Sequence, residues 1–240
     1  MFRTIVISAF GAGLAACLAV TALQAVTTEP LILHAEVFEK AGPPEHDHAA
    51  LAAGQTEAAP AAEADHHHDV GAWEPADGFE RNFYRLVANL LVGVAISLML
   101  LGVMAVKGEP IDARRGLLWG LGGFIAVSLL PSLGLPPELP GTPAAEITSR
   151  QLWWLATASA SAGGLGLIVF GRHWLAWVAA AVLLAAPHLI GAPPPPSEEV
   201  AYPGAMAGQF VIASLAVSAL LWSLAGAASG WLHHRLSATG

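Results

Sequence analysis

The chain has 240 residues, of which 55% are hydrophobic and only 12% are charged. A soluble domain usually has about 25% charged residues, so this composition excludes an ordinary water-soluble domain and indicates a protein of the lipid bilayer. The formal net charge is −8 and the sequence contains no cluster of basic residues, which excludes a nucleic-acid-binding surface.

Six apolar stretches are candidates to cross about 30 Å of hydrocarbon as helices. They cover residues 4–26, 83–106, 116–134, 151–171, 174–190 and 209–231. The fifth is short and follows the fourth after a turn at "GRH", so these two are expected to form a tight helical hairpin. The sequence therefore predicts an all-α, polytopic membrane protein. We divide it into a first transmembrane helix (1–27), an external acidic His-rich loop (28–82) and a five-helix membrane bundle (83–240).

The N-terminal stretch has three interpretations. Arg3 followed by an apolar run is compatible with a cleaved signal peptide, and "LAAC" at Leu14–Cys17 is similar to a lipoprotein processing site. The apolar run continues past Cys17, which favours an uncleaved helix. Cys17 is the only cysteine, so no intramolecular disulfide can form, and we expect it to pack as a small apolar residue.

The first external loop is the one long connection between spans. Its central part, "EHDHAALAAGQTEAAPAAEADHHHD" (45–69), has five histidines, six carboxylates and no Lys or Arg. Such a segment cannot bury enough apolar surface to offset its ordering entropy, so disorder is expected. Neutral imidazole and carboxylate are common metal ligands. The candidate ligands are His34, Glu36, His46, Asp47, His48, Asp65, His66, His67, His68 and Asp69. Their spacing favours a loose chelator of divalent transition metals; the alternative is a solvated polar linker.

The basic residues favour a cytoplasmic N-terminus and C-terminus. With six spans, the inner segments hold Arg3, Lys107, Arg114, Arg115, Arg172 and Arg235, whereas the outer ones hold Lys40, Arg81, Arg85 and Arg150. Sixteen of the eighteen acidic residues fall outside, which predicts an outer face that attracts cations. The expected location is a bacterial inner membrane.

Few polar side chains fall within the spans, and burying them in lipid is costly, so they are candidates for a transport path. We assign Glu80, Asn89, Gln151 and Thr157 to this path and His188 to metal binding. Pro187 removes a backbone donor, so a helix broken beside the His188 imidazole is expected to form a cation site. The alternatives are an interhelical hydrogen bond for Asn89 and a structural partner for His188.

The common catalytic motifs are absent. The sequence has no G-x-x-x-x-G-K-[ST], no H-E-x-x-H and no G-x-S-x-G. No ATP site, zinc-protease site or serine-hydrolase site of these kinds is therefore indicated, and we expect no enzymatic activity and no permanent cofactor.

Six motifs in this order resemble the CbtA family of predicted cobalt transporter subunits over nearly the whole length. They are "EPLILHAEVFE", "WEPADGFER", "GLLWGLGGF", "GLPPELPG", "RQLWWLATA" and "PHLIGAP". The resemblance implies cobalt uptake linked to cobalamin synthesis and a small partner, CbtB, with one span and a His-rich end. It also implies about five spans, one fewer than the six counted above.

These observations predict a membrane subunit of a divalent metal-ion uptake transporter whose external loop collects metal. The ion implied is Co²⁺, although imidazole sites also suit Ni²⁺ and Zn²⁺. One alternative is a membrane-anchored metal sensor or buffer that transports nothing. Another is a membrane enzyme with a His-bound metal, but a single intramembrane histidine is too few ligands for it.

Overall fold

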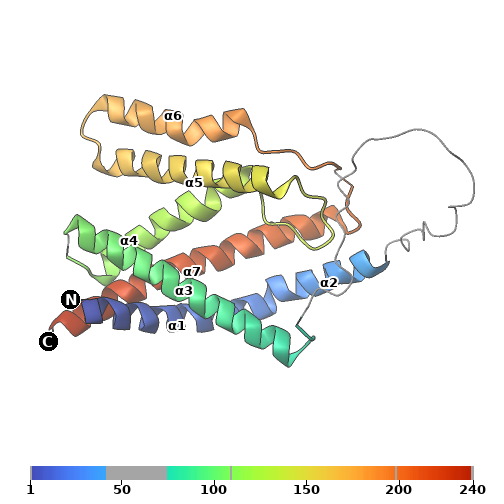
Figure 1. The fold of residues 1–240 in the computed structure, drawn as a ribbon, viewed down its shortest axis with the longest axis horizontal. Helices are drawn as coiled ribbons and strands as arrows, with labels where there is room; N and C mark the ends of the chain where they lie inside the picture. The colour runs from blue at the N-terminus through green and yellow to red at the C-terminus, as the bar shows by residue number, and fades with distance from the viewer. Residues whose placement is uncertain (1, 42–74, 109, 198, 239–240) are drawn as a thin grey trace, which may run out of the picture.

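A computed structural model describes residues 2–41, 75–108, 110–197 and 199–238. These residues form an elongated bundle of antiparallel helices (Figure 1). The elements are α1 (Phe2–Val26), α2 (Thr28–Ala41), α3 (Phe79–Lys107), α4 (Ala113–Phe124), the π-helical turn η2 (Ile125–Leu129), the 3₁₀ turn η3 (Pro131–Leu133), α5 (Ile147–Phe170), α6 (Trp174–Ile190) and α7 (Gly204–Ala238). The predicted all-α fold is confirmed.

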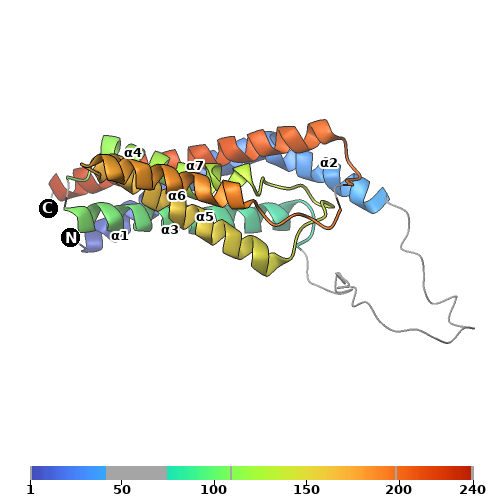
Figure 2. The same cartoon turned by 90° about the horizontal axis from the view of Figure 1, so that it is seen from above.

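Five segments are long and apolar enough to cross a membrane. They are Phe2–Val26, Phe79–Lys107, Ala113–Leu133, Ile147–Phe170 and Gly204–Ala238. The sixth predicted span, α6, has 17 residues, which makes it about 26 Å long, slightly less than the hydrocarbon core. It nevertheless runs back along α5 and so forms the predicted hairpin. The N-terminal end of α1 and the C-terminal end of α7 therefore lie at the same end of the bundle (Figures 1 and 2).

The first helix is part of the packed bundle. It lies against α3 and α7, and its small residues Ala9, Ala12 and Ala16 are fully buried. Cys17 is also buried, and its thiol donates to the carbonyl of Leu86 on α3. This packing agrees with the expected role of Cys17 as a small buried residue.

Helix α2 forms the first part of the segment predicted as an external loop. Residues 28–41, which we assigned to that loop, continue the direction of α1 as a second helix after a turn at Thr27. Its buried residue Ala35 forms a cluster with Leu139, Tyr202 and Phe210, on which Leu31 and Ile32 of the same helix also pack. Burial against these distant partners stabilises a helix whose own sequence is only partly apolar. The 45–69 stretch lies outside the described residues.

The helix break lies in the third span and not at Pro187. Helix α6 continues through Pro187 to Ile190, so this proline, in the last turn, leaves the Leu183 carbonyl without its usual donor but does not end the helix. In the third span, Pro131 has no N–H to donate to Val127, and the Leu130 N–H donates to Ile125 at 2.9 Å. The result is the π-helical turn η2, followed by the 3₁₀ turn η3.

Glycines bring α4 and α7 into backbone contact. A Cβ atom added at Gly116 would lie 2.0 Å from the carbonyl oxygen of Gly226, and one added at Gly120 would lie 2.3 Å from that of Trp222. Gly226 and Gly230 present the matching surface of α7. Membrane helices associate through such close contacts between small residues, because lipid provides no hydrophobic force between them.

We predict that Gly116→Ala destabilises the protein and that Gly122→Ala does not. Both changes gain the same helix propensity, up to about 1 kcal/mol. The Cβ at Gly122 meets nothing within 4 Å, whereas the one at Gly116 meets backbone, and such overpacking costs about 1–3 kcal/mol. Melting temperatures of the detergent-solubilised variants measure the difference. Equal melting temperatures would contradict the packing.

Candidate metal-transport site

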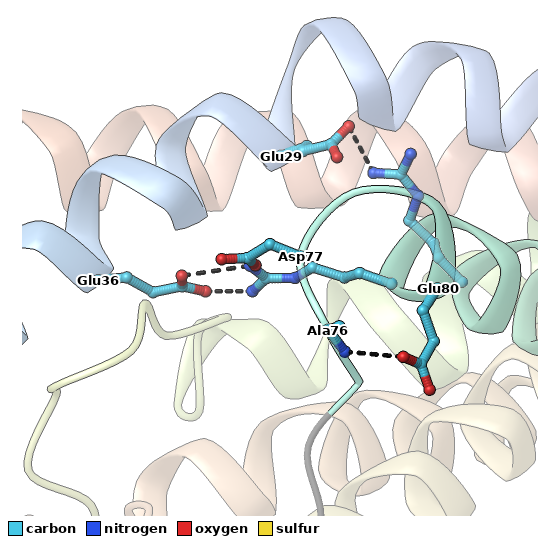
Figure 3. Close-up of polar contacts among 7 residues, drawn as sticks. Glu29, Glu36, Ala76, Asp77 and Glu80 are labelled. Carbon is cyan, nitrogen blue, oxygen red and sulfur yellow. Dashed lines mark hydrogen bonds and ion pairs between the residues drawn. The ribbon is translucent and has the colours of Figure 1, made fainter.

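Two ion pairs join α2 to the beginning of α3. Arg81 contacts both carboxylate oxygens of Glu36 and also lies 3.1 Å from Asp77, and Arg85 lies 2.6 Å from Glu29 (Figure 3). The side chains of Glu36 and Glu29 are only 19% and 25% exposed. These pairs fix the two helices that flank residues 42–74. We call this end of the bundle, formed by residues 28–41, 75–82, 134–146 and 191–203, the α2 end.

The predicted ligand Glu36 and the predicted path residue Glu80 lie apart. Glu36 faces α3 and is engaged by Arg81, whereas the Glu80 carboxylate accepts a hydrogen bond from the Ala76 amide at 3.2 Å (Figure 3). Glu80 therefore caps the first turn of α3, where a carboxylate also favours the helix dipole. His34, the third candidate in this region, is exposed on α2.

Asn89 takes part in an interhelical network. Its Nδ2 donates to Thr21 Oγ1 at 2.9 Å and to Gln24 Oε1 at 2.7 Å, both on α1. The structure thus shows the interhelical bond that the sequence left open as the alternative to a transport role. Polar pairs of this kind hold membrane helices together by about 0.6–2 kcal/mol.

His188 and Trp153 form a second polar group between α6 and α5. Their rings meet edge to face, with centroids 6.0 Å apart. Both His188 Nε2 and Trp153 Nε1 are buried, and neither has a hydrogen-bond partner among the described residues. One turn further along α5, Thr157 is fully buried and its hydroxyl donates to the Trp153 carbonyl at 2.8 Å. Gln151 faces away and lines an open groove of about 490 Å³ with Arg150 and Trp154.

The candidate residues therefore fall into two groups. Glu36, Glu80 and Asn89 belong to α2 and α3, while Thr157 and His188 belong to the α5–α6 hairpin on the other side of α4 and α7 (Figure 1). Among the described residues, no three His, Cys, Asp or Glu side chains come together as a metal site. His46, Asp47, His48, Asp65, His66, His67, His68 and Asp69 lie outside the described residues.

Several other carboxylates are engaged locally. Glu146 caps α5, and hydrogen bonds from the Thr148 side chain and from the amides of Thr148 and Ser149 lower the pKa of its carboxyl to about 2. Glu138 pairs with Arg150 at 2.6 Å. At the opposite end, Asp112 caps α4, and the hydrogen bond from the Arg115 amide lowers its pKa. Much of the acidic charge described at the α2 end thus stabilises structure.

Sequence reasoning missed Trp153 and the pairing of Arg81 and Arg85. Glu29 and Glu36 are two helical turns apart, and Arg81 and Arg85 are one turn apart, a spacing that could have indicated a charged contact between two helices. No local signal indicates that the Trp153 indole meets His188, because the contact depends on how α5 and α6 pack.

Long apolar helices running back and forth define this protein as a multi-pass membrane protein of the all-α class. The chain belongs to the CbtA family, because the family model described as "Probable cobalt transporter subunit (CbtA)" matches residues 2–234. The predicted family and the predicted multi-pass membrane protein are thereby confirmed. No curated protein and no solved structure matches the chain.

We predict that reversing one charge of the Glu36–Arg81 pair destabilises the protein and that reversing both restores it. Glu36→Arg places two guanidinium groups together at a half-buried site and should cost roughly 1 kcal/mol of stability. Arg81→Glu should do the same, and the double variant should recover most of the loss in a melting experiment in detergent.

Glu39→Arg is the control, because Glu39 is exposed on the same helix. It makes the same change in net charge as Glu36→Arg. If the control melts as low as Glu36→Arg, net charge and not the ion pair accounts for the loss.

Proposed function

We propose that this protein is the membrane subunit of a divalent metal-ion uptake transporter and that Co²⁺ is its cargo. The family match over residues 2–234, together with the multi-pass bundle, carries this proposal. Ni²⁺ and Zn²⁺ are competing cargoes, since imidazole ligands also suit them. The transport role involves no catalysis by this chain and no resident cofactor.

The α2 end is the external end in this proposal. The N-terminal end of α1 and the C-terminal end of α7 lie together at the opposite end of the bundle (Figure 1). With this orientation the inner segments hold six of the ten basic residues. Both termini are cytoplasmic in a bacterial inner membrane. The His-rich stretch 45–69 is then external, where its imidazoles and carboxylates would raise the local concentration of metal.

A reporter fusion tests this orientation. A reporter inserted near Gly54 should show an external location, and one fused after Gly240 should show a cytoplasmic location. The expected result follows from the distribution of Lys and Arg, and alkaline phosphatase and green fluorescent protein fusions provide the two readouts. A cytoplasmic signal at Gly54 would reverse the external and internal ends.

The proposed path through the membrane uses both groups of candidate residues, the one on α2 and α3 and the one on the α5–α6 hairpin. Glu36 and Glu80 lie near the junction of α2 and α3, with Asn89 two turns deeper, and they are candidates to contact metal delivered by the loop. Thr157 and His188 are the candidates within the bundle, with Gln151 at its surface. The three arginine–carboxylate pairs fix the α2 end, so the loop histidines are the candidate ligands whose side chains these pairs do not involve.

We propose that the partner of this protein is a small, single-span, His-rich membrane subunit similar to CbtB. This proposal comes from the family resemblance and is tested by expressing this chain with and without such a subunit. The alternative function is a membrane-anchored sensor or buffer that binds metal without moving it. The polar groups buried between α5 and α6 favour transport, because a buffer does not need ligands within the membrane.

Uptake of radioactive cobalt separates transport from buffering. In cells that lack other cobalt importers, a transporter should accumulate cobalt well beyond the amount of the protein present, whereas a buffer should stop at a fixed ratio to the protein.

Deleting residues 45–69 should raise the half-saturating cobalt concentration several-fold and leave the maximal rate unchanged, because the loop concentrates metal without forming the pathway. A Gly/Ser segment of the same length in place of 45–69 is the control for loop length. If the Gly/Ser variant takes up scarce cobalt as well as the original protein does, the collecting role is wrong.

A further inference from the structure

The strongest unexplained feature is the pair of buried, unpartnered nitrogen atoms on His188 and Trp153. An indole N–H can only donate a hydrogen bond, and a neutral imidazole offers one donor and one acceptor nitrogen. A buried polar group left without a partner costs about 1–3 kcal/mol. Two such groups in ring contact therefore point to a ligand that accepts from Trp153 and binds His188.

The indole of Trp153 is held in place by the chain after the third span. A Cβ atom added at Gly134 would lie 2.4 Å from the Trp153 ring and 3.1 Å from Ala192. Only glycine allows this approach, so the connections that hold Gly134 and Ala192 come close to each other, and Gly134 also lies against the Trp153 ring on α5. The imidazole of His188, near the end of α6, meets the Trp153 ring edge to face. The site is therefore built by packing and not by flexible side chains.

The interrupted third span lies against the same helix. η2 and η3 both pack on α5. In a regular helix the carbonyl of Ala126 would accept from the Leu130 N–H, but that N–H donates to Ile125. The carbonyl of Val127 lacks its usual donor because residue 131 is proline. Backbone carbonyls that lose their regular donors are the kind of group that coordinates cations in interrupted membrane helices.

We propose that His188 and Trp153 form a transit site for a hydrated divalent transition-metal cation. His188 Nε2 binds the metal directly, and the Trp153 N–H donates to a water molecule of the hydration shell. The site rests on the transport function proposed above and adds Trp153 as a positioning residue. It holds its cargo weakly, because no group of three His, Cys, Asp or Glu side chains is found among the described residues. A weak site suits transport, since the ion must also leave.

Tryptophan fluorescence of the full chain in detergent tests the site directly, because Co²⁺ quenches a nearby indole. Titration with Co²⁺ should reveal a saturable quenching component in the original protein, and Mg²⁺ should produce none. The component should disappear in His188→Gln, which keeps hydrogen-bonding capacity but removes the metal ligand. It should also disappear in Trp153→Phe.

Trp154→Phe is the matched control, because Trp154 is the next residue on α5 and is exposed on the bundle surface. It should retain the component. His188→Cys restores a metal ligand and should recover at least part of it, so a loss in His188→Gln caused by misfolding is recognised. Persistence in His188→Gln or in Trp153→Phe, or no saturable component in the original protein, overturns the site.

Uptake measurements separate this site from the proposed function. Trp153→Phe should raise the half-saturating Co²⁺ concentration about three- to tenfold with little change in maximal rate, and Trp154→Phe should leave both unchanged. Normal cobalt uptake without a quenching component leaves transport standing and rejects the site. A quenching component without any uptake leaves the metal site standing and rejects transport.

Discussion

The backbone contact between α4 and α7 is the constraint on which the bundle depends. Gly116 and Gly226 approach so closely that neither could carry a side chain. In lipid, where apolar side chains gain little by meeting one another, such contact supplies the dispersion energy that association requires. Helix α7 also lies against α1, α2 and α3. It has 35 residues, about 52 Å, and therefore extends beyond the hydrocarbon core.

This length allows α7 to organise the α2 end as well as the membrane core. Phe210, near its beginning, packs with Tyr202, Leu139 and Ala35. Helix α2 is thereby fixed on one side by apolar contact with α7 and on the other by the ion pairs with α3. The two ends of the His-rich segment are consequently attached to rigid helices.

The sequence predicts the spans well because membrane crossing depends on length and apolar composition, which are local properties. It does not predict α2, whose stability comes from contacts with residues more than a hundred positions away, such as Tyr202 and Phe210. It places the helix break at Pro187 although Pro131 causes it, because the effect of a proline depends on its position within the helix. It groups Asn89 with His188 because both are polar, whereas their partners lie on different helices.

The contacts between helices divide the described bundle into a closely packed unit and a less connected hairpin. Helices α1, α3, α4 and α7 are joined by glycine contacts and by the Asn89 network, and they form one closely packed unit. The α5–α6 hairpin is attached to that unit chiefly through η2 and η3, the part of the third span with irregular backbone bonding. π-Helical turns occur frequently at functional sites, because they move side chains and carbonyl groups out of their regular positions. The His188 and Trp153 rings, whose Nε atoms are buried without a hydrogen-bond partner among the described residues, meet within this hairpin and therefore beside the least regular backbone of the bundle.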